Sequence, residues 1–256
     1  MPQAELKANE IGSELIDLLQ AKSSITEMEF YRYIKDIEKL KDRVSEDYLK
    51  ALANGVYGRK DIAIDFFEAS LKQNSDIFAQ NYVVYLNDYG TFRETRDLVN
   101  RLVPQYGSRT MIGHAWETNL FMGDIDKALY FANKFISIVD ESEGEKMSRI
   151  AASALKDTTE FKQTVGITDE DYKDLANRVV DVMDAYHVKP RVLEFFSVPE
   201  EQTSSYIMFV NSDDIDILSD MNLDIAFSLA ENDNLVGKKF SVWFKGNIEE
   251  DADAGQ

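Results

Sequence analysis

The sequence contains no cysteine, only two histidines and no long apolar run. Without cysteine the chain forms no disulfide bond, has no thiol nucleophile and offers no thiolate to a metal ion. No segment approaches the roughly 18 consecutive apolar residues of a membrane-spanning helix, and the start MPQAELKANE lacks the basic and apolar stretches of a signal peptide. We therefore expect a soluble, cytoplasmic protein that does not bind a membrane.

Basic residues are also scarce, with 28 Lys and Arg against 47 Asp and Glu and a net charge of -19. Such a charge repels the phosphates of nucleic acids and of anionic lipids, so direct nucleic-acid binding is not expected. Residues 187–256 alone hold 5 basic and 14 acidic residues. Two interpretations stay open: a solvated surface that maintains solubility, or an acidic surface for a basic partner protein.

Signatures of catalysis and of cofactor binding are missing from the sequence. It lacks the phosphate-binding patterns GxxxxGK and GxGxxG and the nucleophile pattern GxSxG. His114 and His187 have no second histidine at metal-ligand spacing, so structural roles are expected for both. The acidic run DDIDILSD at 213–220 lacks the central glycine and terminal glutamate of a calcium loop. We predict no catalytic residue, cofactor or metal, and an enzyme with an unrecognised site is the least favoured hypothesis.

Three stretches recur at nearly constant spacing: YGRKDIAIDFF, YGTFRETRDLV and MGDIDKALYFA. Their glycines, Gly58, Gly90 and Gly123, are 32 and 33 residues apart, which is the period of a helix-turn-helix repeat. Glycine suits the turn after a first helix because it accepts a positive φ. Five positions later a small residue allows two helices to approach closely, and apolar residues then recur at helical spacing. The small residues are Ala63, Thr95 and Ala128.

On these residues the chain resembles the tetratricopeptide repeat family over about residues 45–140. The copy MGDIDKALYFANKFI carries the glycine-acid pair, the alanine and the aromatic-rich second helix. The proline that usually follows the second helix of such a repeat is missing from all three copies. The resemblance implies a solenoid of stacked helical hairpins that binds another protein.

Amphipathic helices are predicted on both sides of the repeats. The helix that begins near residue 25 has a candidate capping box in Ser24 and Glu27. From Pro190 the pattern changes to the strand-like stretches VLEFFSV, SYIMFV and KKFSVWFKG. The segment 212–232 between the last two is either one helix or a short helix and a strand, and one helix accounts for more of its pattern.

The sequence therefore predicts an α+β protein. A TPR-like helical solenoid domain is expected over residues 1–187, followed by a small β-β-α-β domain over 190–248. An acidic, disordered tail is expected over 249–256. The C-terminal domain resembles no family that its residues identify.

The helix predicted after residue 212 supplies the first candidate partner-binding residues. Ser212 is the expected N-cap, and an apolar face is formed by Ile215, Leu218, Met221, Ile225 and Leu229. Leu223 and Phe227 fall outside that face, one turn apart, beside a ridge of acids formed by Asp216, Asp220 and Asp224. Two interpretations have equal weight: anchors for a partner protein, or residues that pack within this chain.

Arg93 and Arg96 belong to a local basic cluster with Arg101 and Arg109. Surface salt bridges are the ordinary interpretation, and a dock for an acidic peptide or for the C-terminal domain is the other. Our leading hypothesis is a non-catalytic adaptor that binds another protein. The alternative is an immunity-like or phage-encoded inhibitor whose acidic surface blocks a basic nuclease or nucleic-acid-binding protein. The sequence does not define an oligomeric state.

Overall fold

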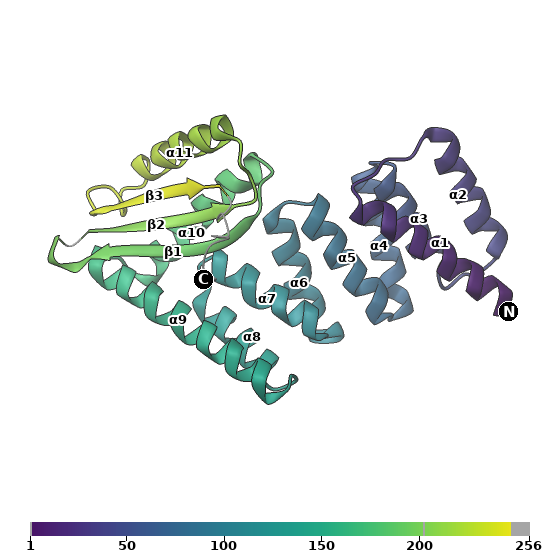
Figure 1. Ribbon diagram of the computed structural model, residues 1–256, viewed down its shortest axis with the longest axis horizontal. Coiled ribbons are helices and arrows are strands. Elements are labelled where there is room, and N and C mark those ends of the chain that lie inside the picture. The colour runs from purple at the N-terminus through teal and green to yellow at the C-terminus, as the bar shows by residue number, and fades with distance from the viewer. Residues whose placement is uncertain (1, 202, 247–256) are drawn as a thin grey trace, which may run out of the picture. The chain divides into compact units, whose positions relative to one another are not determined.

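The computed structural model describes residues 2–201 and 203–246, and the chain divides into two compact units, residues 1–90 and 91–256. Helices predominate, and a small three-stranded sheet lies near the C-terminal end (Figure 1). The predicted α+β class is therefore confirmed. The acidic tail predicted at 249–256 lies outside the described residues.

The first unit is built from helices. They are α1 (Pro2–Gln20), α2 (Glu27–Leu40), α3 (Glu46–Val56), α4 (Lys60–Ser70), the 3-10 helix η1 (Leu71–Gln73) and α5 (Asp76–Tyr89). One face of each amphipathic helix supplies the core, where Leu15, Ile37 and Leu49 are fully buried. Phe67 stacks on Tyr82 with 4.9 Å between ring centroids, which adds directional aromatic packing to the apolar burial.

The second unit combines helices with the sheet. Its elements are α6 (Phe92–Tyr106), α7 (Arg109–Phe121), α8 (Ile125–Ile136), α9 (Glu141–Val165), α10 (Asp169–Ala185), β1 (Pro190–Val198), the 3-10 helix η2 (Pro199–Glu201), β2 (Thr203–Val210), α11 (Ile215–Ala230) and β3 (Phe240–Lys245). The order along the chain from residue 190 is strand, strand, helix, strand. This agrees with the predicted β-β-α-β arrangement.

Turns of the same type join α3 to α4 and α7 to α8. Gly58 and Gly123 follow the first helix of each pair with φ of 85° and 73°, a conformation that strains other residues. In both turns the N–H that follows the glycine donates to the carbonyl of a buried asparagine, Asn54 or Asn119, at 2.9 Å. This hydrogen bond ends the first helix in a Schellman motif. The first and third stretches therefore each form two helices joined by a turn at the predicted glycine.

The middle copy differs at its glycine. Gly90 has φ of −95° and ψ of −178°, an extended conformation, because Thr91 acts as the N-cap of α6. The Thr91 hydroxyl accepts from the Glu94 N–H at 3.1 Å, and the Glu94 carboxylate accepts from the Thr91 N–H at 2.6 Å. The prediction of a positive φ at Gly90 was wrong. The division between the two units falls between Gly90 and Thr91.

The sheet has the order β1-β2-β3. β1 pairs with β2 in antiparallel register, with Phe195 opposite Tyr206, and β2 pairs with β3 in parallel register, with Tyr206 opposite Val242. The parallel pair requires a crossover connection, which α11 provides. β1 and β3 are therefore the two edge strands.

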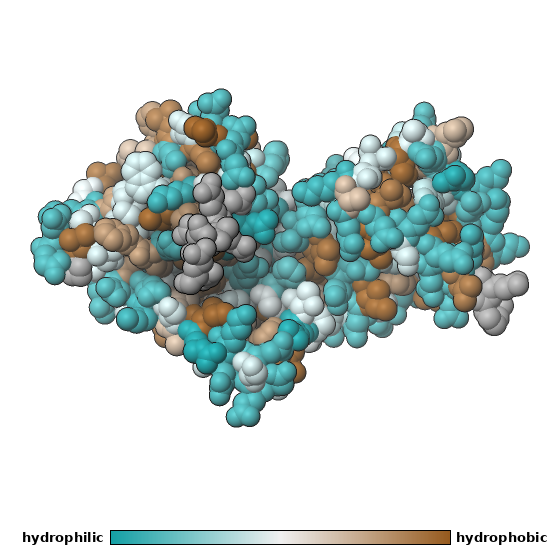
Figure 2. Space-filling view, viewed as in Figure 1, coloured by the Kyte–Doolittle hydropathy of each residue, from teal (hydrophilic) through white to brown (hydrophobic). Residues whose placement is uncertain are grey.

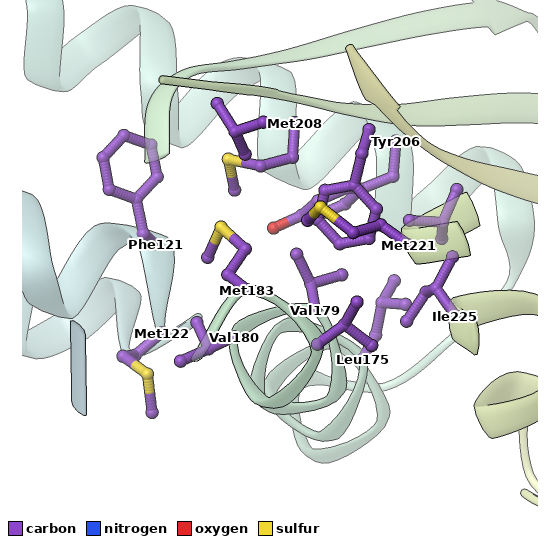
Figure 3. Packing of buried hydrophobic residues seen from close by; sticks show 14 of the residues in the cluster. Phe121, Met122, Leu175, Val179, Val180, Met183, Tyr206, Met208, Met221 and Ile225 are labelled. Carbon is purple, nitrogen blue, oxygen red and sulfur yellow. The ribbon is translucent and has the colours of Figure 1, made fainter. Parts of the chain in front are cut away.

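One face of the sheet packs on helices. Alternate residues of β2, including Tyr206 and Met208, are fully buried, as period-two alternation requires. Figure 3 shows these side chains against Met183 of α10, with Met221 and Ile225 of α11 closing the same cluster. The sheet and α10 thus share one core.

The domain boundary predicted near residues 187–190 does not coincide with a division of the structure. The sheet shares one core with helices on both sides of that predicted boundary. The helix α10, expected to belong to the repeat domain, contributes Leu175, Val179 and Met183 to this core. The structure instead divides the chain after residue 90.

Candidate functional site

Residues 215–230 form one helix, α11, because the sequence provides an N-cap and a continuous apolar face. Asp214 caps it, with its carboxylate accepting from the N–H groups of Asp216 at 3.0 Å and of Ile217 at 3.2 Å. The predicted N-cap, Ser212, lies two residues too early. Met221 and Ile225 are fully buried against the sheet and fix which face points outward.

Leu223 and Phe227 lie on the outward face of α11. They are 55% and 62% exposed and one helical turn apart. The structure therefore does not use them as core residues of this chain. Ile215 was expected on the inner face, but at the first position of α11 it is 80% exposed, whereas Ile217 and Leu218 pack against the core.

Acidic side chains flank this exposed pair. Asp216 and Asp220 are exposed on the same outward face of α11. Asp224 is also exposed, and its carboxylate accepts a hydrogen bond from the Tyr186 hydroxyl at 2.8 Å, which raises the pKa of Tyr186. The structure thus places all five predicted residues of α11 together, and we call Leu223, Phe227, Asp216, Asp220 and Asp224 the α11 surface.

Arg93 and Arg96 are engaged within the second unit. The Arg93 guanidinium binds the carboxylate of Asp181 and donates to the Asn177 side chain at 3.1 Å. The Arg96 guanidinium is 3.6 Å from the carboxylate of Asp124. Their charges are therefore paired with acids of this chain, which favours the salt-bridge interpretation over a dock for an acidic peptide.

A groove that the sequence did not indicate lies between α7, α9 and β1. It has a volume of about 680 Å³, and a second hollow of about 320 Å³ continues it along α9 and β1. Apolar side chains predominate in the larger part, including Trp116, Met147 and Val192. Leu120 and Leu193 line both parts, so the two form one elongated groove.

Carboxylates surround this groove. Glu117, Asp157, Glu160 and Glu194 line it, against the guanidinium of Arg191. Shielding from water raises the pKa of Glu117, and the charge of Arg191 opposes this rise. The Glu117 side chain borders the groove and is 49% exposed. It accepts no hydrogen bond from any described residue.

The sheet face opposite the core carries exposed aromatic side chains. Phe196 is 65% exposed and Trp243 is 49% exposed, and Trp243 lies opposite Ile207 in the register of β2 and β3. Figure 2 shows apolar side chains among polar ones on the surface of this unit. The sequence predicted the strands but not their outward residues, because both parities of VLEFFSV are apolar.

Within 2–201 and 203–246, no three side chains of His, Cys, Asp or Glu gather as a metal ion would require. His187 follows α10 with φ of 55° in a helix-ending turn, where Val188 N–H donates to Met183 O at 3.0 Å. No helix in the described part of the chain is long and apolar enough to cross a bilayer.

Comparison with models of protein families, with curated proteins and with solved structures finds no match for this chain. The α11 surface and the groove have in common that each combines exposed or accessible apolar side chains with carboxylates. Both lie in the second unit, on elements that share its core.

Proposed function

We propose that the protein is a non-catalytic protein-binding module and that the α11 surface contacts its partner. The observation that carries the proposal is the exposure of Leu223 and Phe227 in the middle of the outward face of a well-anchored helix. Two large apolar side chains that are exposed to solvent and lie one turn apart are typical of a helix that binds in a groove of a partner protein.

The acids of the α11 surface define the chemistry of the partner. Asp216, Asp220 and Asp224 border the apolar pair on one side, where they would form the polar rim of an interface. A complementary partner has an apolar pocket and a basic rim. Opposed charges of this kind accelerate association and are screened by salt.

This charge also supports the second candidate function, an inhibitor that covers a basic surface of a nuclease or nucleic-acid-binding protein. The supporting observation is that Asp216, Asp220 and Asp224 are exposed and form no ion pair with a basic side chain of residues 2–201 or 203–246. The two functions differ in salt dependence. An inhibitor of this type should lose at least tenfold in affinity between low and high salt, whereas an adaptor that relies on the apolar pair should lose little.

The test is the double substitution Leu223→Ser and Phe227→Ser in the full chain. Partners captured by the parent are identified, and their affinities for both proteins are measured by calorimetry. We expect the affinity to fall more than tenfold while the melting temperature stays within a few degrees.

The matched control is Met28→Ser with Tyr31→Ser, at two exposed residues three positions apart on α2, 81% and 55% exposed. It should leave the affinity unchanged. Equal loss of affinity in both double variants, or no loss in either, contradicts a role for the α11 surface.

A further inference from the structure

The two edges of the sheet differ in whether their outward backbone groups have hydrogen-bond partners. At the β3 edge the side chain of Asn222 binds the backbone of Phe244, accepting from its N–H at 2.8 Å and donating to its carbonyl at 3.1 Å. This contact occupies the position of a neighbouring strand. Proteins commonly close sheet edges in such ways because an open edge pairs with other chains. The β3 edge is therefore closed at Phe244.

The β1 edge has free backbone groups. The Ser204 N–H donates to Lys239 O at 3.2 Å, on the β3 side of β2. Since backbone groups alternate in direction along a strand, Ser205 of β2 points toward β1, where Phe196 is its partner.

It follows that the backbone N–H and C=O groups of alternate residues of β1 point away from β2, toward the free edge of the sheet. Because the backbone of Phe196 faces β2, the N–H and C=O groups of Leu193, Phe195 and Ser197 face the free edge. None of the described residues forms a hydrogen bond with these backbone groups of Leu193 and Phe195. This edge can accept another strand.

The elongated groove runs along this free edge. Arg191, Val192 and Leu193 are consecutive residues of β1, and all three line its larger part. Because the register of β1 shifts between Pro190 and Val192, regular alternation of side chains is expected only from Val192 onward. Beyond that point Leu193, Glu194 and Phe195 are consecutive and all line the smaller part, as expected of a hollow that follows the edge. The smaller part continues along the same strand as far as Ser197. The opposite wall is formed by α7 and α9.

We infer that the β1 edge binds an extended peptide of a partner protein as a fourth strand of the sheet. At about 3.3 Å per residue, the edge from Leu193 to Ser197 pairs with a peptide of about five to seven residues. Alternate side chains of the peptide enter the groove between α7 and α9. This interaction uses a surface separate from the α11 surface and goes beyond the proposed function.

The charges of the groove specify a basic peptide with apolar side chains. Four carboxylates, those of Glu117, Asp157, Glu160 and Glu194, line the two parts of the groove, together with one guanidinium, that of Arg191. A lysine or arginine of the peptide pairs with Glu117 or Asp157, and apolar side chains at alternate positions contact residues such as Trp116 and Leu120.

The experiment starts from a phage-displayed library of random heptapeptides selected on the full chain. An enriched peptide is synthesised, and its affinity is measured by fluorescence anisotropy. We expect enriched sequences with alternating apolar residues and at least one lysine or arginine. Glu117→Gln combined with Asp157→Asn should weaken binding at least fivefold, whereas Leu223→Ser with Phe227→Ser should not change it.

Two substitutions at Ser197 isolate the backbone contribution. Ser197→Pro removes an outward N–H without removing a hydrogen bond to β2, and it should weaken binding at least tenfold. Ser197→Ala is the matched control, because it also loses the hydroxyl contact with Ser204 Oγ at 2.7 Å but keeps the N–H. It should bind the peptide like the parent.

Hydrogen exchange of the backbone amides of the parent protein, measured by NMR, tests peptide binding at the β1 edge even if Ser197→Pro does not fold. Bound peptide should slow exchange at Leu193 and Phe195 at least tenfold. Failure of the library to enrich any peptide overturns the inference. It is also overturned if enriched peptides are acidic, if they protect amides only elsewhere in the chain, or if a folded Ser197→Pro variant binds them like the parent.

Discussion

The side chain of Asn222 connects α11 to the edge strand β3 through the backbone of Phe244. Besides its two hydrogen bonds with Phe244, its amide donates to the Leu218 carbonyl of α11 at 2.8 Å. The hydrogen bonds hold the helix that presents the α11 surface against the sheet. Removing the side chain leaves the backbone groups of Phe244 without these partners.

Asn222→Ala should therefore lower the free energy of unfolding by about 1 to 3 kcal/mol, because partly buried backbone groups lose their hydrogen bonds. Urea denaturation measures this change. Asn133→Ala, at an exposed residue of α8, is the control and should stay within about 0.5 kcal/mol of the parent. If both variants are equally stable, the Phe244 contact does not stabilise the fold.

Gly58 and Gly123 allow backbone strain to be separated from steric overlap. Both have positive φ, but an added Cβ meets nothing within 4 Å at Gly58, whereas at Gly123 it would lie 2.8 Å from Ala176 Cβ and 3.1 Å from Lys173 Cα. Gly58→Ala should cost about 1 to 2 kcal/mol from the left-handed conformation alone. Gly123→Ala should cost about 1 to 3 kcal/mol more, because α10 lies too close.

Chemical denaturation of the two glycine variants, each at the same protein concentration, tests this difference. Equal losses of stability would mean that α10 moves away from the turn without cost. A smaller loss at Gly123 than at Gly58 would contradict the close approach of α10.

Much of the fold could be predicted from the sequence because its signals are local. The glycine turns at Gly58 and Gly123 and the helical periodicity of residues 215–230 each depend on neighbouring residues. The predicted start of α2 was two residues too early. The structure caps α2 with Thr26 and Glu29 instead of Ser24 and Glu27, because two capping patterns overlap at a spacing of two residues.

The groove could not be predicted, because it joins residues that are distant in the sequence. Glu117 and Asp157 belong to α7 and α9, and Arg191 belongs to β1. Periodicity gives no register between such elements. The same limit applies to the core shared by α10 and the sheet, since nothing local to Pro190 shows that Val179 and Met183 pack on the sheet.

Ala63 and Ala128 occupy equivalent buried positions in the second helices α4 and α8. Each is 0% exposed, so a larger side chain has no space without movement of a neighbouring helix. Ala63→Leu and Ala128→Leu should each lower the free energy of unfolding by about 1 to 3 kcal/mol through overpacking. Ala152→Leu, at an exposed residue of α9, should have little effect in the same urea titration. A variant as stable as the parent would show that its helix contact adapts to the larger side chain.

Tyr48 makes the stability of the first unit sensitive to alkaline pH. It is 5% exposed, its hydroxyl accepts from the Asn81 amide at 2.5 Å, and burial raises its pKa from 10.0 to about 12, against the opposing effect of Asn81. The folded state therefore holds the phenol proton more tightly than the unfolded state does. The resulting stability is complete below pH 10 and is lost as the pH rises through 12.

The size of this effect follows from the shift in the pKa of Tyr48, which corresponds to about 3 kcal/mol. Tyr48→Phe cannot ionise, so its free energy of unfolding should fall less steeply than that of the parent between pH 10 and 12. At pH 8 the same variant should be about 1 kcal/mol less stable, because the hydrogen bond with Asn81 is lost. Urea titrations at each pH give both values. Tyr130→Phe, at a side chain that is 61% exposed, serves as the control. Parallel curves for Tyr48→Phe and the parent above pH 10 would show that Tyr48 ionises without unfolding its surroundings.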